Sequence, residues 1–233
     1  GTLLLANSGC PPFEGAVTGR NALEKSRCST SIETILNAIQ QDTRIKAVII
    51  ASRGPIYLNS KGFGPVEAGY NYPPISERAS INGATETAPI EVFRQGLDAS
   101  LLRLYQHGLR VAYLLQVPEL GVPARDCLCR PLTLTRGESG CTVAFAVYRE
   151  RMHPYRSMIN ELRVSRNFLK IVDPEPYFCD AHACSGFRDN QLLYADDDHL
   201  SVLGSIRLAP AILQALDIEP RAQQSIIPTS GQQ

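Results

Sequence analysis

Several features that would assign this chain to a broad functional class are absent from it. The 233 residues carry 23 basic and 23 acidic side chains, so there is no cationic footprint for a nucleic-acid partner. No apolar run approaches the roughly 18 residues of a membrane-spanning helix. Neither Cys-x-x-Cys spacing nor a histidine cluster occurs, so we expect no metal ion and no cofactor.

The sequence instead alternates apolar runs of strand type with amphipathic helical patterns. This alternation predicts an α/β fold with three α/β/α layers and a parallel sheet. The expected strands cover residues 2–6, 46–51, 110–117 and 168–172. Helices are expected between these strands and after the last one. The first begins near Thr30 or Ser31, the second covers 90–107, the third covers 143–167 with a bend at Pro154, and the fourth follows Ser201.

Residues 1–220 are predicted to form a single domain, and residues 221–233 a flexible tail. Two irregular insertions are expected, at 54–90 and at 118–142. The first holds Tyr57, Tyr70 and Tyr72, which could line a sugar site or could pin the insertion to the core. The second role is the commoner one for tyrosine.

The stretch Tyr194-Ala-Asp-Asp-Asp-His-Leu-Ser201 precedes the last predicted helix. Its acids could simply cap that helix and favour its dipole. Alternatively, Asp196 could orient the imidazole of His199, as the acid and base of a nucleophilic triad do. Active sites of parallel α/β sheets lie at the carboxyl ends of the strands, and this turn falls at that edge. Its position therefore favours the catalytic interpretation.

Four segments, spread over nearly the whole chain, together resemble a known family. They are Asn7-Ser-Gly-Cys-Pro-Pro12, Val48-Ile-Ile-Ala-Ser-Arg53, Cys179…Cys184 and the Tyr194–Ser201 stretch. They resemble the SGNH hydrolase-like domain fused to membrane acyltransferase-3 proteins, which O-acetylate bacterial surface polysaccharides. The resemblance implies an SGNH or flavodoxin-like fold, a glycan acceptor, and a membrane acyltransferase domain as acetyl donor. It also implies a periplasmic or other extracytoplasmic location, tethered to the inner membrane.

The resemblance assigns roles to four residues of this sequence. His199 is the general base that activates a serine, and Asp196 orients it. Gly9 would offer its backbone N–H to an oxyanion. Arg53 stands where the family normally has an asparagine, so it would stabilise the oxyanion or hold substrate.

The family's Gly-Asp-Ser-His block is missing, because no Gly-Asp-Ser occurs in the sequence. We therefore expect the nucleophile, with the first strand and helix of the fold, to lie upstream of Gly1. Ser8 and Ser201 are poor substitutes, since neither sits on a strand-to-helix turn and Ser201 is two residues from His199. His107, His153 and His182 have structural or solvated interpretations.

The implied function is transfer of an acetyl group to a bacterial cell-surface glycan, such as a lipopolysaccharide, by a Ser-His-Asp mechanism. A carbohydrate acetylesterase and a non-catalytic glycan-binding module on the same fold are the alternatives. We predict disulfides between Cys179 and Cys184 and between Cys10 and Cys28. Cys141 is expected to pair with Cys127 or Cys129, which leaves one of the seven cysteines over. This usage is typical of an oxidising compartment.

Overall fold

A short parallel sheet lies at the centre of the fold. The computed structural model describes residues 1–81, 87–127 and 141–219. The sheet has three strands, in the order β2 (Ala47–Ala51), β4 (Arg110–Leu114) and β6 (Lys170–Val172). Each comes from one of the apolar runs that predicted a buried strand.

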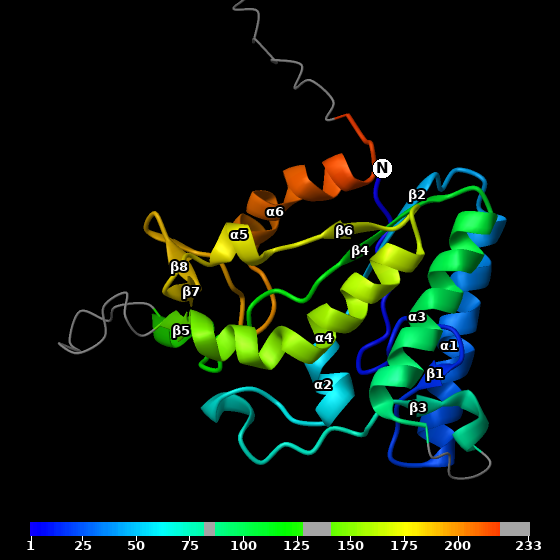
Figure 1. Ribbon diagram of the computed structural model, residues 1–233, viewed down its shortest axis with the longest axis horizontal. Helices are drawn as coiled ribbons and strands as arrows, with labels where there is room; N and C mark the ends of the chain where they lie inside the picture. The colour runs from blue at the N-terminus through cyan, green and yellow to red at the C-terminus, as the bar shows by residue number, and fades with distance from the viewer. Residues whose placement is uncertain (82–86, 128–140, 220–233) are drawn as a thin grey trace, which may run out of the picture.

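Helices cover the sheet on both faces, and the predicted three-layer arrangement is confirmed (Figure 1). Val111 and Tyr113 of β4 are buried in one core with the helices α3 (Pro89–Gln106) and α4 (Phe145–Ser165). Ala112 points to the opposite face, as alternation along a strand requires, and α6 (Val202–Ala215) packs on β4 and β6. Helix α1 (Ala22–Gln41) lies alongside α3 (Figure 1).

Smaller elements fill the regions predicted as irregular. They pair in three two-stranded sheets: β1 (Ala16–Val17) with β3 (Ser76–Glu77), β5 (Thr142–Ala144) with β7 (Ala183–Ser185), and β8 (Phe187–Arg188) with β9 (Gln191–Leu192). The short helices are α2 (Gly54–Asn59), α5 (Glu175–Phe178), η1 (Pro65–Glu67), η2 (Arg78–Ile81) and η3 (Ala124–Cys127). Among the described residues, no helix is both long and apolar enough to cross a bilayer.

The strand predicted at residues 2–6 is wrong. This segment is not a strand, and Leu3 and Leu4 are 64% and 86% exposed. Apolar residues form a strand only where a neighbour supplies the other half of the hydrogen-bond ladder. Within the described part of the chain, β2 pairs with β4 on one side and with no strand on the other.

The start of the first helix was also predicted too late. Helix α1 begins at Ala22, because Asn21 caps it by accepting a hydrogen bond from the Glu24 N–H at 2.9 Å. The Glu24 carboxylate in turn accepts from the Arg20 N–H at 2.7 Å and from the Asn21 side-chain amide at 3.1 Å, which ties the residues before the helix to its first turn. The first turns are mostly polar and exposed, so apolar periodicity shows only the second half of the helix. Helices α3 and α6 form where predicted. Helix α4 does so too and continues through Pro154, but it begins at Phe145, because Val143 belongs to the strand β5.

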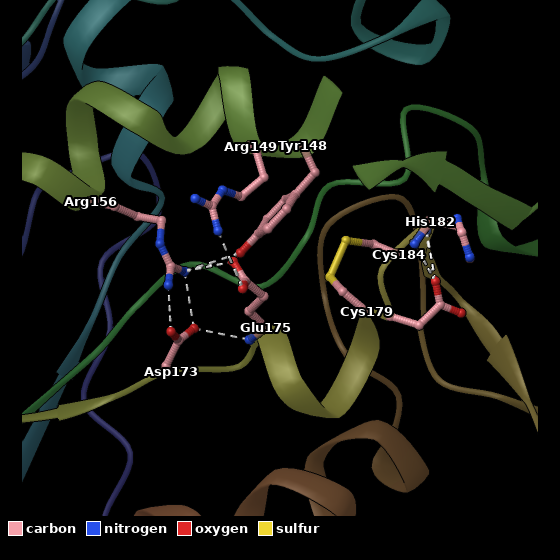
Figure 2. Close-up of a disulfide and its surroundings, with 10 residues drawn as sticks. Tyr148, Arg149, Arg156, Asp173, Glu175, Cys179, His182 and Cys184 are labelled. Atoms are coloured by element: carbon pink, nitrogen blue, oxygen red, sulfur yellow. Dashed lines mark hydrogen bonds and ion pairs between the residues drawn. A yellow bond between two sulfur atoms is a disulfide. The ribbon is translucent and has the colours of Figure 1, made fainter. Parts of the chain in front are cut away.

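Three disulfides join the chain: Cys10–Cys28, Cys127–Cys141 and Cys179–Cys184. The first and third confirm predicted pairs, and the second resolves which cysteine bonds Cys141. Figure 2 shows Cys179–Cys184 closing the loop between α5 and β7, where the Asp180 carboxylate accepts the His182 N–H at 2.7 Å. Cys129 and the predicted tail at 221–233 lie outside the described residues.

Candidate active site

A tight turn between β9 and α6 carries the first residues of the site. The Ala195 N–H donates to the His199 carbonyl at 2.8 Å, which closes the turn. Inside it, one oxygen of Asp196 accepts the backbone N–H groups of Asp198 and His199 at 3.0 and 2.7 Å. A short acidic side chain readily makes such local bonds to its own turn. Hydrogen bonds from the backbone therefore fix the orientation of the Asp196 carboxylate.

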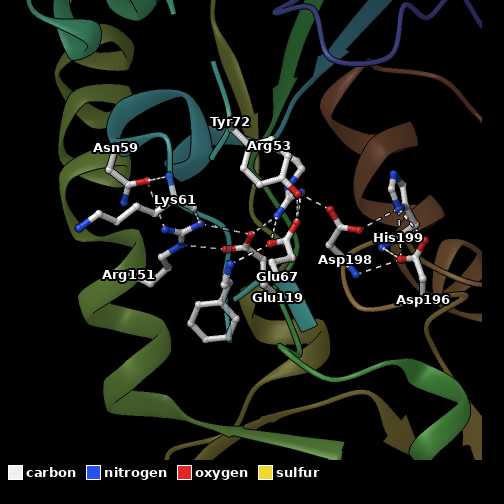
Figure 3. Close-up of polar contacts among 11 residues, drawn as sticks. Arg53, Asn59, Lys61, Glu67, Tyr72, Glu119, Arg151, Asp196, Asp198 and His199 are labelled. Carbon is white, nitrogen blue, oxygen red and sulfur yellow. Dashed lines mark hydrogen bonds and ion pairs between the residues drawn. The ribbon is translucent and has the colours of Figure 1, made fainter. Parts of the chain in front are cut away.

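That carboxylate also holds the imidazole of His199. The two Asp196 oxygens lie 2.9 and 3.1 Å from Nδ1, whereas the His199 side chain is 72% exposed. Figure 3 shows the second ring nitrogen turned away from the carboxylates. An Nδ1–H donated to Asp196 leaves Nε2 with a free lone pair, which is the tautomer a general base needs.

The turn does not serve as the cap of the following helix. Ser201 caps α6, since its Oγ accepts the Gly204 N–H at 3.2 Å and donates to the Leu192 carbonyl at 2.8 Å. Both capacities of this hydroxyl are therefore used within the structure. The capping interpretation of the acids is wrong for α6, and Ser201 is a poor nucleophile for the same reason.

Asp198 is a second carboxylate on His199, which the sequence pattern did not single out. Its Oδ1 lies 2.8 Å from Nδ1, and its side chain is only 6% exposed. Its other oxygen lies 2.9 Å from Nε of Arg53. Asp198 thus links the histidine to the arginine that follows β2 (Figure 3).

Arg53 binds two further carboxylates behind Asp198. Its guanidinium makes a bidentate pair with Glu67 at 2.9 and 2.8 Å and contacts Glu119 at 2.6 Å. Arg151 of α4 adds a second cation on Glu119 at 2.9 Å. Glu119 follows β4, so the carboxyl ends of two neighbouring strands bring Arg53 and Glu119 together.

The backbone around Arg53 is held by packing beneath it. Ser52 hydrogen-bonds the Tyr113 hydroxyl at 2.8 Å, and Tyr155 donates to the same hydroxyl at 2.9 Å. Gly54 packs so closely on Tyr155 that a Cβ there would lie 2.3 Å from the ring. A side chain at the residue after Arg53 would therefore displace the Tyr155 ring, and glycine avoids this.

Burial and charge shift the pKa values of the cluster. Burial raises the pKa of Asp198 to about 6, although Arg53 and His199 oppose that rise. Burial alone would lower the pKa of His199, but the charges of Asp198 and Asp196 outweigh it, so the pKa lies above its ordinary 6.5. Burial also works against the charged form of Glu67, yet Arg53 and Tyr72 bring its pKa down to about 2.

Arg53 and Gly9 are the other two residues to which the sequence assigned a role in the site. The roles of Arg53 and Gly9 at an oxyanion remain predictions. Arg53 is near the histidine, but its nitrogens are engaged by carboxylates. Gly9 has a φ of +77°, and its carbonyl accepts the Thr18 hydroxyl at 2.5 Å, so its contacts belong to the segment before α1. His107 contacts the Gln40 carbonyl at 2.8 Å, a structural role.

A metal ion is the other chemistry that such a cluster could hold. Asp196, Asp198 and His199 each offer one ligand atom, and these three atoms lie within 4.8 Å of one another. A metal on Nδ1 would replace the hydrogen bond to Asp196 and the ion pair with Asp198 that hold the ring. The donor set therefore fits an N–H between carboxylates better than a ligand set, and the six cysteines in disulfides are not available as thiolates.

Comparison with known proteins identifies the family. Residues 1–214 match the family described as "SGNH domain (fused to AT3 domains)". The chain therefore belongs to the SGNH domains that are fused to AT3 domains, as the sequence resemblance predicted.

The fold is similar to that of the periplasmic domain of the lipopolysaccharide acetyltransferase of Salmonella ser. Paratyphi A. The TM-score is 0.52 at 15% identity, over 88% of this chain and 68% of that one. At this identity the likeness concerns the fold. No curated protein matches the chain.

Proposed function

We propose that this chain is the extracytoplasmic domain of an O-acetyltransferase that acetylates a bacterial cell-surface glycan. The observation that carries the proposal is the Asp196–His199 pair, in which Nδ1 is held at 2.9 Å and the rest of the ring is exposed. Membership of the SGNH domains fused to AT3 domains supports acetyl transfer as the chemistry.

The proton steps follow from the tautomer. Nε2 of His199 accepts the proton of a serine as that serine takes an acetyl group, and returns it to the leaving group. It then accepts the proton of a sugar hydroxyl as the hydroxyl attacks the acetyl ester, and finally returns that proton to the serine. Asp196 stabilises the imidazolium at each stage, and the buried Asp198 adds to this.

The serine of this triad would come from a segment outside the 233 residues, which contain no Gly-Asp-Ser. Two observations support a place for such a segment next to the site. Strand β2 has an unpaired edge within the described part of the chain. The first turns of α6, directly after His199, expose Val202, Leu203 and Ile206 by 76%, 43% and 62%. A further strand beside β2 would complete the ladder.

The location and the donor belong to the same proposal. Three disulfides fit an oxidising compartment such as the periplasm. The AT3 domains of the family fit a membrane-embedded acetyl donor that tethers this domain to the inner membrane. The similar Salmonella domain is itself periplasmic.

The test is His199→Ala in the full-length protein, with surface-glycan acetylation as the readout. We expect a loss of at least ~10²-fold, as for removal of a general base. The matched control is His107→Ala, which removes an imidazole that contacts the Gln40 carbonyl and should leave acetylation intact. Equal acetylation by wild type and His199→Ala would refute the proposal.

Two alternatives make different predictions in the same assay. A carbohydrate acetylesterase would release acetate at the same rate with and without saturating glycan acceptor. A non-catalytic glycan-binding module would keep its glycan affinity and show no turnover of acetyl donors. A transferase instead releases less free acetate as the acceptor concentration rises.

A further inference from the structure

The three tyrosines of the first insertion have different surroundings. Tyr57 is packed against the core, with its ring 6.2 Å from that of Phe93. Tyr70 is 64% exposed, and Tyr72 is half-buried. Tyr57 thus pins the insertion to the core, whereas Tyr70 does not.

The segment that carries Tyr70 and Tyr72 is nevertheless held in place by its backbone. The Tyr70 N–H donates to the Glu67 carbonyl at 3.1 Å, and the Tyr72 N–H donates to the Ser60 carbonyl at 3.2 Å. Lys61 and Asn71 pair as an isolated antiparallel bridge. An exposed aromatic ring on a fixed backbone is preorganised to bind, because little entropy is lost on contact.

The Tyr70 and Tyr72 rings are neighbours and nearly parallel. Their centroids are 6.3 Å apart and their planes are inclined by only 26°, the geometry of an offset pair. The exposed residue Asn71 lies between the two tyrosines in the sequence, so the segment carries an amide as well as two rings. Nearly parallel tyrosines suit a pyranose ring, whose C–H face is apolar and whose edge carries hydroxyls.

The tyrosine pair is connected to the catalytic cluster through Tyr72. The Tyr72 hydroxyl donates to Glu67 at 2.5 Å, and the guanidinium carbon of Arg53 lies 5.8 Å from the Tyr72 ring centroid. Arg53 contacts Asp198, which contacts His199. Figure 3 shows Tyr72, Arg53, Asp198 and His199 in one row. A sugar on the tyrosines would therefore lie beside the acetylation site.

We infer that Tyr70 and Tyr72 form a platform on which a pyranose ring of the acceptor glycan stacks next to His199. The inference rests on the proposed function for the identity of the ligand as acceptor. It adds a binding subsite and two residues to that function: Tyr70 supplies the exposed face, and Tyr72 joins this face to Arg53 and Glu67.

The test measures binding of a panel of trisaccharides (chitotriose, maltotriose, and galactan and rhamnan fragments) by saturation-transfer NMR and titration calorimetry. At least one is expected to bind, with saturation strongest on the C–H groups of one ring. Tyr70→Ala should weaken that binding roughly tenfold, whereas Tyr70→Phe should retain it, since stacking needs the ring and not the hydroxyl. Tyr105→Ala is the control, because Tyr105 is 47% exposed and stacks on Phe168 at the opposite end of β4.

The outcomes separate the platform from the proposed function. If no trisaccharide binds, or if Tyr70→Ala binds as tightly as the wild type, the platform is overturned. His199→Ala should keep the trisaccharide affinity while acetylation in the full-length protein is lost. Retained acetylation in His199→Ala would overturn the proposed function but leave a measured platform standing.

Discussion

The carboxylate of Asp198 lies 2.8 Å from Nδ1 of His199 and is shielded from solvent, although Asp196 already holds the same nitrogen. One carboxylate is exposed and fixed by its turn, and the other is buried and fixed by Arg53. The protonation of His199 therefore depends on both acids, and through Asp198 on the arginine cluster.

The first prediction concerns pH. The pKa of His199 lies above 6.5, so the general base becomes neutral, and the acetylation rate rises, only as pH passes through that raised value. Asp198→Asn removes a charge that stabilises the imidazolium, so the pKa falls and the acidic limb of the rate profile moves to lower pH. NMR titration of the His199 ring measures the shift. Asp189→Asn, which alters an exposed acid paired with Arg207, is the control and should leave it unchanged.

The second prediction concerns the cluster around Arg53. Arg53→Ala leaves Glu67, Glu119 and Asp198 without their shared cation, and should cost roughly 3 kcal/mol in urea unfolding at pH 7. The difference from wild type should shrink as pH falls, because in the variant these acids protonate at higher pH and lose their repulsion. A penalty that stayed the same at pH 4 would show that packing, not charge, is responsible.

The third prediction concerns the glycine after Arg53. Gly54→Ala would place a methyl group 2.3 Å from the Tyr155 ring, so we expect a loss of about 1–3 kcal/mol from overpacking. Adding Tyr155→Ala makes room for the methyl group, so the double variant should be more stable than the sum of the single effects predicts. Thermal unfolding of the four proteins measures this coupling. Simple additivity would show that the ring does not impose the glycine.

The fourth prediction concerns the disulfides. Cys10–Cys28 spans 18 residues, and its loss in a Cys10→Ser/Cys28→Ser variant should cost about 3 kcal/mol through a less constrained unfolded chain. Cys179–Cys184 spans only 5 residues, and its loss should cost less. Chemical unfolding of both double variants gives the comparison. Peptide mapping without reductant checks the Cys127–Cys141 pairing, and a Cys129 link to either partner would contradict it.

Local patterns predicted the framework of the fold and the Asp196–His199 pair, but not the neighbours that the fold brings to them. The strands β2, β4 and β6 are apolar runs with clear ends, and His199 follows its acid at a fixed spacing. Asp198 stands in a run of three acids, and the sequence does not show which of them is buried. That distinction depends on Arg53, far away along the chain.

Glu67 and Glu119 were missed for a related reason. Glu67 lies in an insertion without periodicity, so no pattern indicated that it would reach Arg53. Glu119 follows Pro118 after an apolar run, as Arg53 follows another. Arg53 and Glu119 have opposite charges and each follows one of two neighbouring parallel strands. This placement could have predicted their ion pair. The error at residues 2–6 has another cause. The segment has the local propensity of a strand, but among the described residues no strand pairs with it.

The unpaired edge of β2 has a practical consequence for work with the isolated domain. Among the residues that the structure describes, no strand pairs with this edge, so the edge, together with exposed Leu3 and Leu4, is a template on which a second molecule can add a strand. Solutions of the domain, without reductant so that the disulfides remain intact, should therefore form concentration-dependent oligomers that light scattering detects. Crystals of the isolated domain should favour contacts that continue the sheet from one molecule into the next.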